Sequence, residues 1–368
     1  AHIPSLRPLT TLEQLAHLTA FEIRRVVRGK AFLILMGLSC AALWFWVSMY
    51  GRAYGTGFFP YTGYMAEHVV TVFRLPLLAM LIFYAADATW TSRLHHSHQI
   101  IEATPIPNAA LFLSKLLCLF VVACLALAIG VSTAIGYQLY RGFFAIDLEV
   151  YLIHTGLIAL PYFLVMACFA LVFQAIANNR FAGMLAMTTL VLFSLTAVEL
   201  DITSNFLIPG GQHPVHYNAL AGFGHYLQPA LWFHAYWLLV GVLVSIAGML
   251  IWRRGDDAGF AGRFRQLKAG LGPRGVLLPL LGTALALVAV AGVISHHTLI
   301  RNPTASEAAR EAKAAAYERQ HGELRDLPQP DIEHVEGTLD LFPKTRHFVF
   351  DARYRLVNQK DEPISRII

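Results

Sequence analysis

The chain has 368 residues, of which 56% are hydrophobic and only 14% are charged. Soluble globular proteins carry about 25% charged residues, so this composition excludes an ordinary soluble domain over most of the chain. The formal net charge of +5 is small. Because its Lys and Arg residues cluster beside apolar stretches, we expect a lipid membrane as partner and no nucleic acid.

Seven long apolar stretches dominate the first 300 residues, and each is about as long as a helix that crosses roughly 30 Å of hydrocarbon. The sequence therefore predicts an all-α polytopic membrane protein of about seven transmembrane helices, with a short extracytoplasmic β-rich tail. The predicted spans are residues 31–49, 69–86, 110–136, 151–177, 182–199, 229–252 and 276–296.

The Lys and Arg residues between these spans predict an orientation. Fourteen lie in the N-terminal segment and in alternate loops, whereas the other loops hold only Arg52 and Arg141. Cytoplasmic loops carry the excess of basic residues. We therefore expect the N-terminus in the cytoplasm and the tail after the seventh span outside.

Residues 11–30 form an amphipathic pattern directly before the first span. Leu12, Leu15 and Leu18 belong to an apolar stripe, with Arg24 and Arg25 off it. Such a helix is expected to lie in the cytoplasmic membrane interface.

Two of the predicted spans contain residues that are unusual in lipid. Arg74 lies in the second span, where a charge either faces protein or water in a functional role or extends its side chain to the membrane surface. Pro161 is expected to kink the fourth span.

Trp232, Trp237 and Trp252 fit a belt at the membrane interface better than a ligand site.

The cytoplasmic loop at residues 87–117 carries the main functional signal. We expect a short helix at Thr91–Ile101 along the membrane face, then a turn at Glu102–Pro105 and re-entry of the chain at Asn108–Lys115. A polar, partly apolar helix in a cytoplasmic loop is a surface that a soluble partner would contact.

This loop resembles that of the permease subunits of ABC-2 type transporters, through its Ala-Thr-Pro turn after Glu102 and through Lys115 at the start of the third span. The resemblance covers roughly residues 11–255 and implies an exporter permease. A separate ATP-binding subunit would seat on the loop, with a second permease half or a homodimer as the other partner. It also implies that the subunit contacts are His95, Gln99, Glu102, Thr104 and Pro105.

The chain departs from that family at His95, His96 and His98, where Arg, Glu and Asp are common. Consecutive His residues on a helix point in different directions, so we expect no metal site there. Cys40, Cys118, Cys124 and Cys168 also lack metal-ligand spacing.

No GxxxxGK[ST] motif, which would form a phosphate-binding loop, occurs in the sequence. ATP is therefore expected on the partner subunit, and no cofactor is expected in this chain.

The loop at residues 200–228 is long, aromatic and free of Lys and Arg between Glu199 and Gln228. It is expected to be a structural re-entrant or surface loop. The alternatives are that it caps an external cavity or meets the following peptidase-like domain.

The tail changes from a helical to a β pattern. Residues 304–322 are rich in Ala, Glu, Arg and Lys and predict a helix. Val335–Phe342 and His347–Val357 predict strands, the second with Phe348, Phe350 and Tyr354 on one face.

The strands resemble the opening of the N-terminal β-domain of M1 aminopeptidases, through Gly337–Pro343, Phe348–Asn358 and Asp361–Ile364. There is a bacterial family in which an ABC-2 permease is fused to an M1 peptidase, and the chain looks like that junction. The alternative function is therefore a membrane-anchored M1 zinc aminopeptidase whose catalytic part lies beyond this chain. No His-Glu-x-x-His occurs here, so no catalytic residue is assigned and zinc is expected only with such a domain.

The resulting organisation has four parts in the bacterial inner (plasma) membrane. A connecting helix at 1–30 precedes a six-helix permease domain at 31–255. A basic loop and seventh span follow at 256–300. An extracytoplasmic helix and the start of an M1-like β-domain are expected at 301–368.

Overall fold

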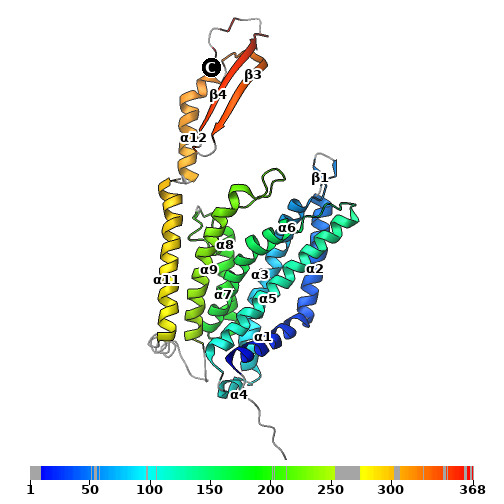
Figure 1. Ribbon diagram of the computed structural model, residues 1–368, viewed down its shortest axis with the longest axis vertical. Coiled ribbons are helices and arrows are strands. Elements are labelled where there is room, and N and C mark those ends of the chain that lie inside the picture. The colour runs from blue at the N-terminus through cyan, green and yellow to red at the C-terminus, as the bar shows by residue number, and fades with distance from the viewer. Residues whose placement is uncertain are drawn as a thin grey trace, which may run out of the picture. The chain divides into compact units, whose positions relative to one another are not determined.

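The computed structural model describes residues 10–50, 52–53, 56–57, 59–96, 98–104, 106–200, 202, 204–212, 214–252, 274–301, 307–325, 327–342, 345, 347–359, 363–364 and 367. They belong to two units, residues 1–303 and 304–368. The first is a helical bundle and the second a helix with a hairpin (Figure 1).

The first unit is built from helices and one tiny hairpin. Its helices are α1 (Thr11–Val27), α2 (Lys30–Tyr50), α3 (Thr62–Leu94), α4 (His98–Ala103), α5 (Asn108–Tyr140), α6 (Leu148–Tyr151), η1 (Leu152–Ala159), α7 (Leu160–Ile176), α8 (Arg180–Thr196), η2 (Gly224–Tyr226), α9 (Leu227–Leu250), α11 (Arg274–Ser295) and η3 (His296–Arg301). Strands β1 (Arg52–Ala53) and β2 (Thr56–Gly57) pair antiparallel between α2 and α3.

Within the described residues, six helical segments are long and apolar enough to cross a membrane: Lys30–Met49, Thr62–Leu94, Asn108–Tyr140, Leu148–Ile176, Gly224–Leu250 and Gly275–Arg301. The predicted span at 182–199 is a shorter apolar helix, α8, of 17 residues. At 1.5 Å per residue α8 is about 26 Å long, which is less than a usual crossing. Six of the seven predicted spans thus correspond to helices of the required length, whereas the fifth, at 182–199, corresponds to the shorter helix α8.

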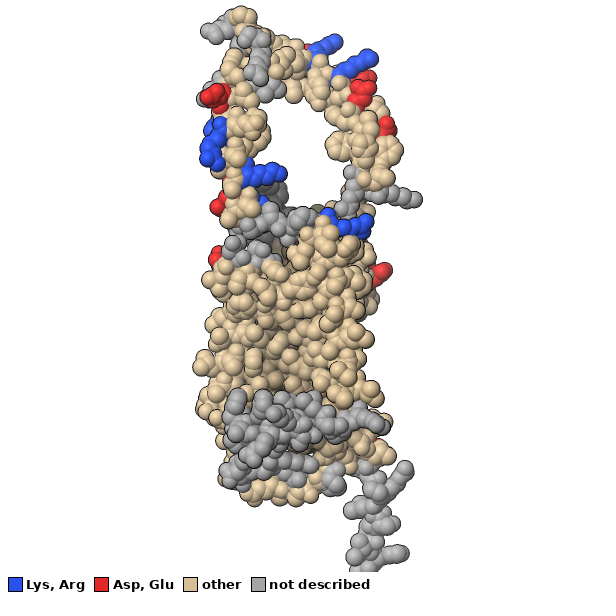
Figure 2. Space-filling model, turned by 90° about the vertical axis from the view of Figure 1, so that its left-hand side faces the viewer, with Lys and Arg blue, Asp and Glu red and all other residues tan. Residues whose placement is uncertain are grey.

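The surface of the bundle agrees with an apolar surrounding. Figure 2 shows the face that carries α11, and no Lys, Arg, Asp or Glu is visible over the middle of the helical unit. Large apolar side chains such as Leu285 and Val288 on α11 are about 70% exposed, at 72% and 68%. In water such a surface would be unfavourable, whereas lipid tails are as apolar as these side chains.

Helix α7 lies at the centre of the bundle, in contact with α3, α5, α8 and α9, while α11 lies beside α9 (Figure 1). Small residues let these helices approach. A Cβ on Gly130 of α5 would lie 2.8 Å from Val69 Cγ1 of α3, so only glycine fits there. Such close packing is what associates helices in lipid, where no hydrophobic effect drives them together.

A buried polar cluster fixes the end of the bundle at which α3 begins. Gln138 is completely buried, and its Nε2 donates a 2.8 Å hydrogen bond to the Pro60 carbonyl. The Tyr151 hydroxyl donates to Gln138 Oε1 at 2.8 Å, and the Asp147 amide donates to Thr62 Oγ1 at 3.1 Å. Each partner therefore satisfies a group that would otherwise be costly to bury.

The helical segment around Pro161 changes its hydrogen-bond pattern but continues through the proline. Residues 152–159 form the π-helical segment η1, and the Leu160 amide donates to the Thr155 carbonyl. Pro161 follows in the first turn of α7, where its missing N–H is tolerated. A kink is expected from the sequence at Pro161. The irregularity that the structure shows there is the π-helical segment that precedes the proline.

The second unit contains α12 (Glu307–His321), the short turn η4 (Gly322–Leu324), and strands β3 (Asp331–Phe342) and β4 (His347–Val357). The strands pair antiparallel, with Leu339 opposite Phe350 and Val335 opposite Tyr354. The β4 boundaries and its alternating face are confirmed. That face is exposed, since Phe350 is 50% and Tyr354 is 52% accessible.

Two sequence expectations need correction. The expected helix at Thr91–Ile101 is interrupted, because α3 ends at Leu94 and His96 adopts a left-handed backbone with φ of 55°. A left-handed residue cannot continue a right-handed helix. Trp237 and Trp252 are buried inside the bundle and so do not form an interfacial belt.

Candidate functional site

Two hollows at different places in the bundle bring polar residues together. The first, here named the Arg74 cavity, lies between α3, α7, α8 and the segment 205–214, and has a volume of about 390 Å³. The second, here named the α1–α4 groove, lies between α1, the end of α3, α4 and α5, and has a volume of about 420 Å³. Each contains residues that the sequence singled out.

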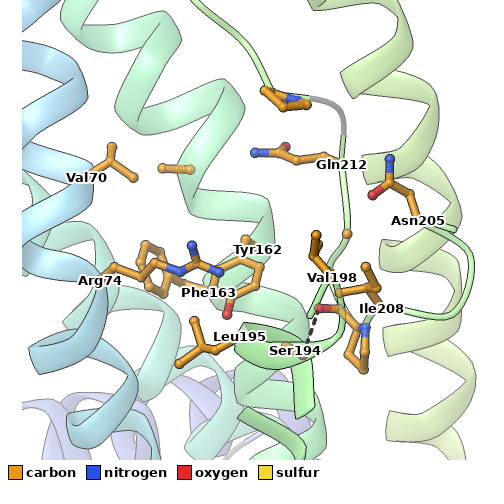
Figure 3. Close-up of a pocket in the computed structure, with 15 residues that line it drawn as sticks. Val70, Arg74, Tyr162, Phe163, Ser194, Leu195, Val198, Asn205, Ile208 and Gln212 are labelled. Carbon is orange, nitrogen blue, oxygen red and sulfur yellow. Dashed lines mark hydrogen bonds between the residues drawn. The ribbon is translucent and has the colours of Figure 1, made fainter. Parts of the chain in front are cut away.

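Arg74 extends from α3 into the first cavity, as Figure 3 shows. Its guanidinium carbon lies 5.1 Å from the ring centroid of Tyr162 on α7, which is a cation–π distance. Arg74 Nε is buried, and it has no hydrogen-bond partner in the part of the chain that the structure describes. The side chain thus faces protein and not the membrane surface, whereas a functional role for Arg74 stays a prediction.

The segment from Asn205 to Pro214 closes one side of the Arg74 cavity. Gly210 has φ of +70°, and a Cβ there would lie 2.5 Å from Tyr162 Cδ2. Trp237 of α9 donates from Nε1 to the Asn205 carbonyl at 2.9 Å. The described residues between 205 and 214 therefore cover a cavity, and Gly210 lets this part of the loop approach the tyrosine ring, whereas the external location of the cavity stays a prediction.

The α1–α4 groove is built around a network of charges. Lys115 of α5 donates from Nζ to Glu22 Oε1 of α1 at 2.7 Å. Arg25 Nη2 lies 3.0 Å from Glu22 Oε2 and 3.1 Å from Asp87 Oδ2 of α3. The two Arg25 contacts meet the distance criterion for an ion pair but do not have the geometry of a hydrogen bond. The hydrogen bond between Lys115 and Glu22 is therefore the better formed interaction.

This network connects three helices at one end of the bundle. The Glu22 and Lys115 side chains are only 9% and 13% exposed. Charges buried to this degree are costly unless they are paired. The pairing therefore holds α1 against α3 and α5.

A second connection crosses from α3 to α7 and α8 at the same end. Trp90 donates from Nε1 to Gln174 Oε1 at 2.8 Å, and Gln174 Nε2 donates to the Arg180 carbonyl at 3.4 Å. Gly183 packs directly on the Gln174 amide, since a Cβ there would lie 2.5 Å from Gln174 Cδ. The hydrogen bond between Trp90 and Gln174 connects the end of α3 to α7, the central helix of the bundle, and α3 also contacts α5.

The residues predicted to contact an ATP-binding subunit lie around α4. His95 and Gln99 are exposed, whereas Thr104 is half-buried and lines the groove. Glu102 belongs to α4, but its side chain and the whole of Pro105 lie outside the described residues. His98 is buried and lines the groove, and the selection of contact residues from the sequence had left it out.

Sequence reasoning also missed Glu22, Arg25 and Asp87. It treated Arg25 only as part of a polar helix face, and it treated Lys115 only as part of a motif. The signal was present, because Glu22 is a rare acidic residue on a helix next to a basic cluster. In a charge-poor chain, such a residue is expected to have a partner.

The described part of the chain contains no group of three His, Cys, Asp or Glu side chains that could hold a metal ion. His216 Nδ1 lies 3.6 Å from Glu67 Oε1, but both side chains are about half exposed. A metal or zinc role is thus not assigned to these residues.

No protein-family model matches the chain, and no curated protein is significantly similar to it. The functional argument therefore rests on its own residues and geometry.

Proposed function

We propose that this chain is the membrane permease subunit of an ABC-2 type exporter, driven by a separate ATP-binding subunit that contacts residues 87–117. The proposal rests on the resemblance of that loop, together with an arrangement that suits force transmission. The short helix α4, with Gln99 and Ile100 exposed and His98 buried, lies beside a groove whose walls belong to α1, α3 and α5.

The observation that carries the proposal is the Glu22–Lys115 hydrogen bond beside α4. Helix α4 lies in the connection between α3 and α5, and both of these helices contact the charge network. A partner that pushes α4 would therefore act on α1, α3 and α5 together. ATP binding and hydrolysis on that partner would then reorient the spans, as alternating access requires.

The location and orientation belong to the same proposal. The end of the bundle with α1, α4 and the charge network faces the cytoplasm, since that end is where the Lys and Arg excess lies. The membrane is the bacterial inner membrane. The permease would pair with a second permease half or with a second copy of itself.

The test is purification of the chain from its native membrane in mild detergent, followed by mass spectrometry and an ATP-hydrolysis assay. We expect a protein containing GxxxxGK[ST] to co-purify in a fixed ratio and to hydrolyse ATP. Charge reversal by Glu102→Lys, together with Gln99→Ala, should release it.

A matched control is Glu149→Lys, which reverses an exposed charge on α6, at the other end of the bundle. It should retain the partner. Absence of any ATP-binding protein, or equal retention by both variants, would contradict the proposal.

A second candidate is a membrane-anchored M1-type zinc aminopeptidase, and one observation favours it. The hairpin of β3 and β4 exposes an apolar face that includes Leu339, Phe350 and Tyr354. A two-stranded hairpin is marginally stable alone, so this face is suited to pack on further β-structure. Peptides of the native protein that continue into His-Glu-x-x-His, with chelator-sensitive aminopeptidase activity, would support this candidate.

A further inference from the structure

The Arg74 cavity has the size and lining of a small-molecule site. Its volume of about 390 Å³ falls in the range of typical ligand pockets, about 300–1,000 Å³. Most of its wall is apolar, with Val70, Phe163, Leu195, Val198 and Ile208 around it (Figure 3). A ligand that fills it would therefore bury an apolar part.

The positive charge in this wall has no protein counter-ion in the described part of the chain. No Asp or Glu is among the described lining residues, and Arg74 has no ion pair there. A guanidinium among apolar side chains is costly unless an anion or hydrogen-bond acceptors surround it. An anionic group in the cavity would supply what Arg74 lacks.

The geometry of Arg74 also leaves its donors available. The guanidinium carbon lies 5.1 Å from the centroid of the Tyr162 ring, so the cation packs on that ring. The N–H donors of a guanidinium point outward in its plane, which is the arrangement that binds a carboxylate or phosphate through two parallel hydrogen bonds. Packing on Tyr162 restricts the side chain before a ligand arrives, which lowers the entropy lost on binding.

Other polar atoms without partners surround the same space. The Tyr162 hydroxyl and Gln212 Oε1 are buried and have no hydrogen-bond partner among the described residues. In Figure 3 the Gln212 amide points into the cavity from the loop, opposite Val70, with Arg74 and Tyr162 below it. Buried polar groups without partners are rare. Arg74 Nε and the Tyr162 hydroxyl are donors that an anion would satisfy, whereas Gln212 Oε1 accepts and is satisfied by a water or by a donor group of a ligand.

We propose that the Arg74 cavity binds an oxyanion, a carboxylate or a phosphate, carried on a compact apolar group. Arg74 binds the oxyanion and the Tyr162 hydroxyl donates to it. Gln212 contributes its amide from the loop, and the aliphatic and Phe163 side chains cover the apolar part. This site goes beyond the proposed function, because its binding requires no ATP-binding partner.

The test uses 4-benzoylbenzoate, a compact apolar carboxylate that crosslinks on illumination, with the purified full chain in neutral detergent. Its uncharged analogue 4-methylbenzophenone serves as the matched control ligand. We expect the carboxylate to label the peptides that contain Tyr162 or residues 194–212 at about tenfold lower concentration than the analogue, as the loss of one charge-assisted contact predicts. Equal labelling of these peptides by both compounds would overturn the proposal, and this comparison needs no variant.

Two variants and two competitors complete the test. Arg74→Gln should reduce labelling by the carboxylate about tenfold, and Arg180→Gln, which removes an exposed charge on α8, should leave it unchanged. Unchanged labelling in Arg74→Gln would contradict the role of Arg74. Competition by inorganic phosphate indicates a soluble anion as the natural ligand, whereas competition only by phosphatidic acid in the micelle indicates a lipid headgroup.

Discussion

Lys115 Nζ donates a 2.7 Å hydrogen bond to Glu22 Oε1, although 93 positions separate the two residues along the chain. The contact joins the amphipathic helix α1 to α5, one of the helices that are long and apolar enough to cross a membrane. The contact fixes α1 in the bundle, because removal of either charge would leave the other one buried without this partner.

The first prediction follows from the unequal surroundings of these two charges. Glu22 keeps Arg25 at 3.0 Å when Lys115 is removed, whereas Lys115 keeps no carboxylate within ion-pair distance, among the described residues, when Glu22 is removed. Glu22→Gln should therefore destabilise the protein by about 3 kcal/mol, and Lys115→Met by clearly less. Thermal unfolding in detergent measures both.

The double variant Glu22→Gln/Lys115→Met is the control for this prediction. It removes both partners, so it should recover part of the stability lost in Glu22→Gln. If the two single losses simply add, the contact has no coupling energy and the account of α1 as a fixed part of the bundle is wrong.

The second prediction concerns the start of α1 and its pH dependence. The Thr10 amide and hydroxyl donate to Glu13 Oε2 at 2.8 and 3.0 Å, and the Glu13 amide donates to Thr10 Oγ1 at 3.3 Å. The hydrogen bond from the Thr10 amide, followed by that from its hydroxyl, lowers the pKa of Glu13. The stabilisation is therefore present above the usual carboxylate pKa and is lost as pH falls through the lowered value.

Acidification below about pH 4 should thus fray the first turn of α1. Amide chemical shifts of ¹⁵N-labelled Thr and Glu between pH 7 and 3 measure this. In Glu13→Gln the side chain keeps the capping arrangement but does not titrate, so its shifts should stay constant. Identical pH profiles for the two proteins would rule out the capping effect.

How much of the fold the sequence predicts depends on the kind of signal. Continuous apolar runs predict spans well, because lipid requires about 20 apolar residues in a row. The alternation in β4 likewise predicts its face, since the strand period is two. The break at His96 was missed, because a left-handed backbone at a single non-glycine residue leaves little trace in the sequence.

The candidate sites were predictable only in part. Arg74 was found because a charge in an apolar run is rare. Its partners, Tyr162 on α7 and Gln212 on a loop, are set by tertiary packing over long sequence distances, and no local pattern reveals them. The same reason hid the pairing of Glu22 with Lys115.

The third prediction tests the connection between Trp90 and the bundle centre. Ala at position 183 would place its Cβ 2.5 Å from the Gln174 Cδ and displace the amide that accepts from Trp90. Gly183→Ala should destabilise the protein by about 1–3 kcal/mol, as overpacking usually does. The matched control is Gly136→Ala on α5, where nothing lies within 4 Å and the gain in helix propensity should be neutral or slightly stabilising. A Gly183→Ala protein as stable as the Gly136→Ala protein would show that α8 can shift freely against α7.

The fourth prediction separates backbone strain from steric contact at the Arg74 cavity. Gly210 and Gly222 both have left-handed backbones, with φ of +70° and +60°. A Cβ on Gly210 would lie 2.5 Å from Tyr162, whereas nothing lies within 4 Å of a Cβ on Gly222. Each alanine substitution costs about 1–2 kcal/mol for its backbone, so the difference in stability between the two variants reports the contact of the Gly210 Cβ with Tyr162 and, at 3.3 Å, with Met166 Cε.

We therefore expect Gly210→Ala to be the less stable variant by at least about 1 kcal/mol, measured by thermal unfolding in detergent. Because the substitution pushes the loop away from Tyr162, it should also weaken labelling of the cavity by 4-benzoylbenzoate, and Gly222→Ala should leave labelling unchanged. Equal stability and equal labelling in the two variants would mean that the loop does not rest on Tyr162. Reduced labelling in Gly210→Ala alone would connect the loop directly to the shape of the cavity around Arg74.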